Sequence, residues 1–196
     1  MRTIVMVGMV VGSAAVTACG GRIRTDGSSP ASAATLRGMP SWYKQPMAID
    51  GKSMYQAATA TSQDLQVAIN RAQAEGRLGL ATQLEVKYGA LTQRFVEESG
   101  VSGDAQLLDE FRQTYKAVVS QVLIGSRAKA QQFQIDGGVY RAWVLMELPV
   151  GEASRKLLDQ IKAQQQMYTR VRATEAFKEL NTEVEQFEAA KASRKP

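Results

Sequence analysis

The only cysteine of the chain, Cys19, is the residue whose chemistry is most informative. The chain has 196 residues, one Cys and no His. A single thiol cannot form an internal disulfide, so the cysteine count does not report an oxidising compartment. Because His is lacking, a Ser-His-Asp triad, a Cys-His pair and a His metal site are all excluded. The position of Cys19 in the chain then decides its role.

Carboxylates and glycines are the other candidates for chemistry. The pairs Glu97-Glu98 and Asp109-Glu110 are adjacent in sequence, and adjacent residues do not face each other on a helix. Gly76 and Gly79 lie within a helical pattern, and Gly137-Gly138 is typical of a turn, so no phosphate-binding loop is indicated. We therefore expect no enzyme, no cofactor and no metal. An enzyme that uses only Lys or carboxylates is the remaining alternative.

Residues 1–18 have the layout of a secretory signal peptide. Arg2 is followed by an uncharged stretch rich in Val, Met, Ala and Gly. This stretch is too short for a bilayer span, which needs about 20 apolar residues. Val16, Thr17 and Ala18 precede Cys19, and small residues next to the scissile bond fit a signal peptidase. The alternatives are a signal peptide cut elsewhere, which leaves a free thiol, and an uncleaved anchor.

The segment Val16–Cys19 resembles a bacterial lipobox. The resemblance implies a diacylglycerol on the sulfur of Cys19, cleavage before Cys19 and acylation of the new amine. Each buried CH₂ of such chains contributes about 0.8 kcal/mol, so two or more chains give a stable anchor. Gly20, rather than Asp, follows the cysteine. By resemblance to Gram-negative lipoproteins this predicts the outer membrane, with the protein on its periplasmic side.

Composition then divides the rest of the chain. Residues 19–38 are predicted to be the lipidated N-terminus and a flexible linker, because the segment is rich in Gly, Ser, Ala and Thr; its reach is about 25 Å. The formal net charge is +5, but the charges are interspersed, which is typical of a solvated face, and no nucleic acid is expected as a partner. Residues 39–150 are predicted to form one domain, and 151–196 a helical extension.

Hydrophobic periodicity predicts the elements of the domain. Residues 53–61 alternate as a strand, and Ser62 or Asp64 caps a helix with a stripe of small residues. Residues 84–90 alternate again as a strand, Asp104 caps an amphipathic helix, and Asp136-Gly137-Gly138 joins strands 126–135 and 139–148 in a hairpin. The expected fold is therefore α+β, with a mainly antiparallel sheet of about four strands, helices on one face and a long C-terminal helix. The small stripe comprises Leu65, Ala68, Ala72, Gly76 and Leu80.

The C-terminal pattern from 152 to 191 is helical. Phe177, Leu180, Val184 and Phe187 follow the spacing of a heptad seam. The step from Val171 to Phe177 is out of register, which predicts a bend near 172–174. Our expectation is that the second half projects, so that Leu180, Val184 and Phe187 contact a partner and become buried only in an assembly. The alternative is that the tail folds back over its own sheet.

Three short motifs resemble the LPP20 family of bacterial lipoproteins, together with the lipobox. They are MPSWYKQP, with Pro40, Trp42 and Pro46; AINRAQAEGRLGLA, residues 68–81; and YRAWVLMEL, residues 140–148. The resemblance covers about 40–150; Gly76 departs from the usual Ala, and the helical tail is not explained. The family implies a non-enzymatic envelope lipoprotein, and some relatives contribute to flagellar basal disks or outer rings.

These observations leave two classes of function. The first is a structural or assembly lipoprotein that binds envelope proteins or copies of itself, tethered to the membrane through Cys19. The second is an envelope module that binds a small ligand or a cell-wall component. Trp42 and Tyr43 could form a ligand platform, but aromatic residues at such a position more often fix a chain entry onto the core. A deep pocket with converging polar groups would favour the second class.

Overall fold

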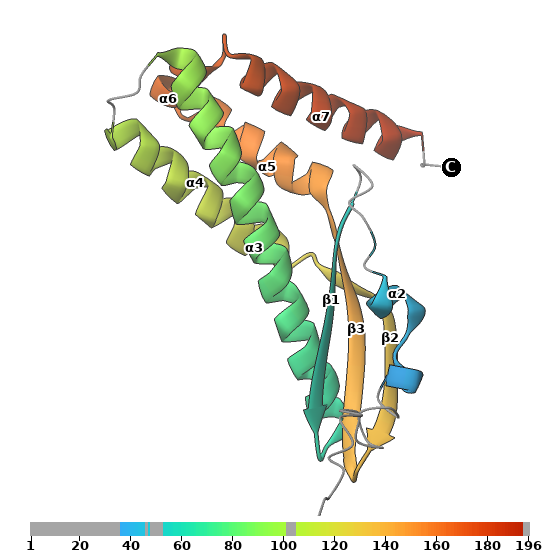
Figure 1. The fold of residues 1–196 in the computed structure, drawn as a ribbon. Helices are drawn as coiled ribbons and strands as arrows, with labels where there is room; N and C mark the ends of the chain where they lie inside the picture. The colour runs from blue at the N-terminus through green and yellow to red at the C-terminus, as the bar shows by residue number, and fades with distance from the viewer. Residues whose placement is uncertain (1–35, 46, 48–52, 101–104, 194–196) are drawn as a thin grey trace, which may run out of the picture.

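The computed structural model describes residues 36–45, 47, 53–100 and 105–193. Figure 1 shows a sheet at one end of the molecule and a group of helices at the other, joined by the long helix α3. Cys19, the predicted signal peptide and most of the predicted linker lie outside the described residues, as do Pro46 and Asp104. The elements are α2 (Ser41–Lys44), β1 (Ser53–Ser62), α3 (Leu65–Ser99), α4 (Ala105–Leu123), β2 (Arg127–Asp136), β3 (Val139–Pro149), α5 (Val150–Ala163), α6 (Gln165–Val171) and α7 (Glu175–Ala192).

The sheet of the described chain has three antiparallel strands in the order β1-β3-β2. The predicted hairpin is confirmed: β2 and β3 are joined at Gly137 and Gly138, whose φ angles of 60° and 89° suit glycine. Strand β3 is central, and β1 and β2 each have one free edge. A bulge interrupts β2 between Ala128 and Ala130. The fold is thus mixed helix and sheet, with three strands rather than about four.

The missing strand is residues 84–90, which lie inside the 35-residue helix α3. The helix starts where predicted, with the Asp64 carboxylate accepting a hydrogen bond from the Val67 amide at 2.8 Å. Leu84 and Tyr88 are buried because they continue the stripe of Ala72, Gly76 and Leu80 at a spacing of four. The alternation of apolar residues in 84–90 also fits a strand, so a short window could not separate the two interpretations. The strand prediction was wrong.

The small stripe of α3 packs directly on the sheet. Ala68, Ala72 and Leu80 are fully buried, and a Cβ added at Gly76 would clash with the Met146 side chain of β3. Gly76 lacks a side chain, so the helix can approach β1 and β3 closely. The cost in helix propensity is about 1 kcal/mol, and the close packing of the two layers offsets it.

Enlarging this stripe should therefore destabilise the protein. Ala72→Leu is expected to lower the free energy of unfolding by about 1–3 kcal/mol, because the added atoms have no space between helix and sheet. The matched control is Ala74→Leu on the exposed side of the same helix, for which we expect little change. Thermal melting followed by circular dichroism measures both. Equal melting temperatures for the two variants would show that the stripe is not closely packed.

The opposite face of the sheet is covered in part by the N-terminal segment. Helix α2 contacts β1 and β3 on the side away from α3, so the expectation of helices on one face is not confirmed. Trp143 points to this second face and is only 1% exposed, which makes it a core residue. Trp42 and Tyr43 are half-buried and meet edge to face, with ring centroids 6.3 Å apart.

The C-terminal extension is three helices rather than one rod. The chain breaks at Gln164 and again at 172–174, where the bend was predicted. After the second break, α7 folds back along α5 and contacts α3 (Figure 1). One hydrophobic cluster includes buried residues from both sides of the predicted boundary at residue 150, such as Leu148 and Leu157. The extension is therefore packed on the helices of the domain.

The prediction that the second half of the tail projects was wrong. Leu180 and Val184 are only 3% and 6% exposed within a single chain, and Phe187 is partly buried against Gly151, where an added Cβ would clash with its ring. These side chains do not need an assembly to become buried, because α5 and α3 already pack against them within one chain. The heptad spacing of these residues therefore reflects the packing of α7 on α5 and α3 within the chain.

Candidate functional site

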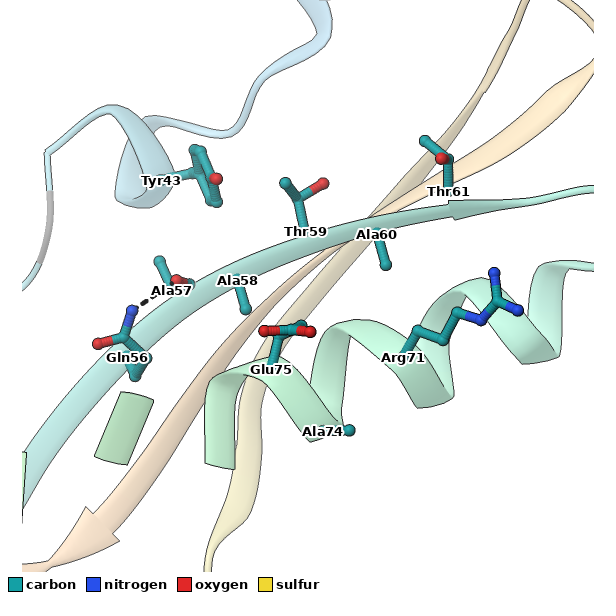
Figure 2. A pocket seen from close by; sticks show the side chains of 10 residues that line it. All are labelled: Tyr43, Gln56, Ala57, Ala58, Thr59, Ala60, Thr61, Arg71, Ala74 and Glu75. Carbon is teal, nitrogen blue, oxygen red and sulfur yellow. Dashed lines mark hydrogen bonds between the residues drawn. The ribbon is translucent and has the colours of Figure 1, made fainter. Parts of the chain in front are cut away.

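A hollow of about 680 Å³ along the free edge of β1 is the candidate site. Six consecutive residues of the strand line it, with Tyr43 of α2 on one side and three residues of α3 on the other. Figure 2 shows Ala57 and Thr59 on the Tyr43 side of the strand, and Ala58 and Ala60 on the α3 side. The lining residues are Tyr43, Gln56, Ala57, Ala58, Thr59, Ala60, Thr61, Arg71, Ala74 and Glu75.

Small side chains give the hollow its form. Alanine and threonine dominate the strand from Ala57 to Thr61, so the backbone of β1 is not hidden beneath long side chains. The charged groups are Arg71 and Glu75, which lie four residues apart on α3. Neither forms an ion pair with another described residue. The polar groups of the hollow thus do not converge on one point; they border a strand edge.

Backbone carbonyls at this edge accept hydrogen bonds from side-chain amides. The Gln83 amide donates to the carbonyl of Tyr55 at 3.2 Å, and the Gln56 amide donates to the carbonyl of Ala57 at 3.0 Å. Buried or half-buried backbone groups need such partners where no neighbouring strand supplies them. The edge of β1 is therefore a row of donors and acceptors that another extended segment could bind.

A second polar cluster lies on the α2 face of the sheet, around the buried carboxylate of Glu147. Arg127 donates to Glu147 Oε2 at 3.0 Å, and the Tyr55 hydroxyl donates to Oε1 at 3.3 Å. The Lys129 ammonium lies 3.7 Å from Oε1 and donates to the Tyr55 hydroxyl at 3.0 Å. Burial would raise the pKa of Glu147, but the hydrogen bond and charge of Arg127, with the charge of Lys129, hold that pKa below its ordinary value.

This cluster is satisfied within the chain, which indicates a structural role. Glu147→Gln should lower the free energy of unfolding at pH 7 by about 1–3 kcal/mol, because Arg127 and Lys129 lose their charged acceptor. A carboxylate with a lowered folded-state pKa stabilises the protein above its unfolded pKa, near 4.5, and loses that effect as pH falls through the folded-state value. The difference from wild type should therefore shrink in acid.

Urea unfolding at pH 7 and at about pH 3 measures this prediction. Glu185→Gln, at an exposed position on α7, is the control and should change stability little at either pH. A Glu147→Gln variant as stable as wild type at pH 7 would show that the ion cluster adds nothing to the fold.

The sequence-predicted site residues and the structural site do not coincide. Cys19 lies outside the described residues, and Leu180, Val184 and Phe187 belong to the packed helical end. Within the described ranges, no group of three or more His, Cys, Asp or Glu residues could hold a metal ion. No helix among the described residues is long and apolar enough to cross a membrane.

The edge hollow was not predicted, although one signal for it stands in the sequence. Residues 53–62 contain no charged residue and no proline, and natural edge strands usually carry such residues to prevent pairing. That signal becomes informative only when the strand is known to be at an edge.

No family model matches this chain, and a comparison with curated proteins finds no significant similarity.

Proposed function

We propose that the protein is a non-enzymatic lipoprotein, anchored through Cys19 to the periplasmic side of the outer membrane, that acts in the structure or assembly of the envelope by binding proteins. The signal-like residues 1–18 and the lipobox-like segment before Cys19 support the anchor. The observation that carries the binding role is the uncharged outer edge of β1, which pairs with no other strand in the described part of the chain, since such an edge is a surface that another polypeptide can extend.

The geometry of the hollow favours this function over binding of a small ligand. Small-molecule sites are usually concave and place a few polar groups toward one point. Here Arg71 and Glu75 border the hollow along one helix, and the remaining lining is mostly backbone, Ala and Thr. A ligand held at one point would find few directed contacts, whereas an extended chain would find them at every second residue.

The three motifs that resemble the LPP20 family form one packed unit, which supports a proposed relationship to that family. Residues 40–45 include α2, residues 68–81 form the sheet-facing part of α3, and residues 140–148 belong to β3. Gly76, the departure from the family pattern, lies against Met146 of the third motif. The Met146 side chain occupies the space that a Cβ at position 76 would need, which favours glycine there.

Cross-linking in the native envelope tests the proposed function. Membranes from cells that express the wild-type protein are treated with an amine-reactive reagent, and the linked species are identified by mass spectrometry. We expect discrete products that contain this chain joined to itself or to other envelope proteins. If the chain stays uncrosslinked at its native level while a known envelope complex is captured in the same sample, the assembly role is wrong.

A further inference from the structure

The two free edges of the sheet differ in how well they are protected against pairing. The β2 edge carries Arg127 and Lys129 and contains the bulge near Ala128. The amide of Gln132 also donates to the carbonyl of Gly38 at 2.9 Å, so the N-terminal segment lies against this strand. Charges, bulges and covering segments are the usual devices that prevent edge-to-edge association. Strand β2 is thus blocked.

Strand β1 carries no charged residue and no proline over Gln56–Thr61, and among the described residues only Tyr43 of α2 and part of α3 lie beside this stretch. It pairs with β3 in continuous register from Ser53 to Ser62 and shows no bulge. The carbonyls of Tyr55 and Ala57 accept from side-chain amides, which places the odd-numbered backbone groups on the free edge. By the period of two, the amide and carbonyl groups of Thr59 and Thr61 face the same way.

The flanks of this edge are complementary to themselves. Ala58 lies opposite Gly76 of α3, and Gln56 opposite Gly79, so α3 runs antiparallel to β1. Arg71 and Glu75 therefore lie on either side of the helical position that faces Thr59 and Ala60. Ala74, between them, is small and exposed. A two-fold axis at Thr59 would bring Arg71 of one copy toward Glu75 of the other.

We propose that two copies of this chain pair through β1 in antiparallel orientation, with the two-fold axis at Thr59, to form a continuous six-stranded sheet. Thr59 pairs with Thr59 of the second copy, and Ala57 pairs with Thr61. Each such pair exchanges both backbone hydrogen bonds, which gives about six across the interface. The Gln56 amide leaves the Ala57 carbonyl when the second strand arrives. This inference rests on the proposed assembly function and identifies the binding partner as a second copy of the chain.

Charge and side-chain size favour a second copy over an unrelated strand. The edge itself is neutral, so specificity must come from the flanks, and opposite charges placed symmetrically about the axis select an antiparallel copy. Ala58 and Ala60 face each other across the axis on the α3 side, where larger side chains would separate the two α3 helices. A strand from another protein is an outcome that the test below distinguishes.

Disulfide formation in native membranes tests the register. The sulfur of Cys19 is blocked if it carries lipid, so Thr59→Cys supplies the only free thiol. Paired residues that exchange both hydrogen bonds have Cα atoms about 5.5 Å apart, within the range of disulfides. We expect a covalent dimer on mild oxidation. Gln131→Cys, exposed on the blocked β2 edge, is the control and should stay monomeric.

A mixed experiment tests the antiparallel orientation. Ala57→Cys and Thr61→Cys should each remain monomeric alone, because like positions are then far from the axis, and should cross-link when both are expressed in the same cell. Absence of dimer in both the Thr59→Cys and the mixed experiment overturns the proposal. A disulfide between Cys19 residues of the wild type would show that the sulfur is free and would contradict the lipid anchor. In that case the effect of the charge variants on self-association decides whether β1 pairs.

Charge reversal supplies that second measurement. Arg71→Glu and Glu75→Arg should each weaken self-association of the detergent-solubilised full chain about tenfold, because like charges then face each other. The double variant should restore wild-type association. Sedimentation velocity measures the dimer fraction, and unchanged melting temperatures exclude loss of folding. Single variants that associate like wild type, or a chain that is monomeric at all concentrations, overturn pairing through β1 and leave a strand of another protein as the occupant.

Discussion

Deletion of residues 175–196 is expected to unfold the helical end of the protein. Four buried apolar residues of α7 would be lost, namely Ala176, Phe177, Leu180 and Val184, and the surfaces of α5 and α3 beneath them would be exposed to water. Burial of one large apolar side chain contributes about 1.5–3 kcal/mol. The sum approaches the total stability of about 5–15 kcal/mol of an ordinary domain. We expect the truncated chain to melt without a cooperative transition.

Polar contacts that hold α7 in place would be lost as well. The Lys87 ammonium pairs with Glu183 at 2.6 Å, and Arg94 pairs with Glu179 at 2.7 Å. The Glu98 carboxylate also accepts a hydrogen bond from the Ala176 amide at 3.0 Å, at the start of α7. These interactions join α7 to the C-terminal half of α3, so its removal affects two elements of the core.

A point variant keeps this prediction falsifiable if the truncated chain cannot be purified. Leu180→Ala should lower the free energy of unfolding by about 2–5 kcal/mol, because a buried side chain leaves a cavity. Gln186→Ala, at an exposed position on the same helix, should change it little. Urea unfolding measures both. A truncated chain that melts like the full-length protein would show that α7 is not part of the folded core.

Local signals in the sequence predicted the parts of the fold that depend on neighbouring residues. The Asp136-Gly137-Gly138 turn fixed the hairpin, because glycine adopts positive φ without strain. The Asp64 cap located the start of α3, and the change of register after Val171 located the bend before α7. In each case the physical cause lies within a few residues of the feature, so the sequence alone contains it.

Features that depend on distant residues were not predictable in the same way. Leu84 and Tyr88 satisfy both a strand and a helix pattern, and only the continuation of the stripe toward Phe95 decides for helix. Likewise, the spacing of Leu180, Val184 and Phe187 predicts an apolar helix face but does not determine which element packs against it. The sequence left two interpretations, a projecting tail and a tail folded over its own sheet, and the structure shows neither, because α7 packs on α5 and α3. The edge position of β1 is also a tertiary property.

Replacement of Cys19 by Ser is expected to abolish membrane anchoring. If residues 16–19 are processed as a lipobox, the sulfur of Cys19 carries the diacylglycerol, and a serine hydroxyl does not replace the thiolate as acceptor. Two or three acyl chains give an essentially stable tether, whereas none leaves only weak surface attraction. The variant should therefore leave the membrane fraction and appear, where it is processed, in the soluble periplasmic fraction.

The folded body should be unaffected by this change, because Cys19 lies 17 residues before Leu36, the first residue that the structure describes. Extracted wild-type and Cys19→Ser proteins are expected to share one melting temperature. A matched control is Thr17→Ser, which keeps a small residue before the cysteine and should leave anchoring intact. Loss of anchoring in Cys19→Ser with retention in Thr17→Ser would assign the effect to the thiol.

Metabolic labelling with a radioactive or alkyne-tagged fatty acid tests the central claim, the lipid anchor, most directly. Cells that express the wild-type chain or Cys19→Ser are labelled, and the protein is isolated and scored for incorporated fatty acid at equal protein amounts. The proposed anchor predicts strong labelling of the wild type and none of the variant. Equal labelling of the two proteins, or an unlabelled wild type beside a labelled control lipoprotein, would contradict it.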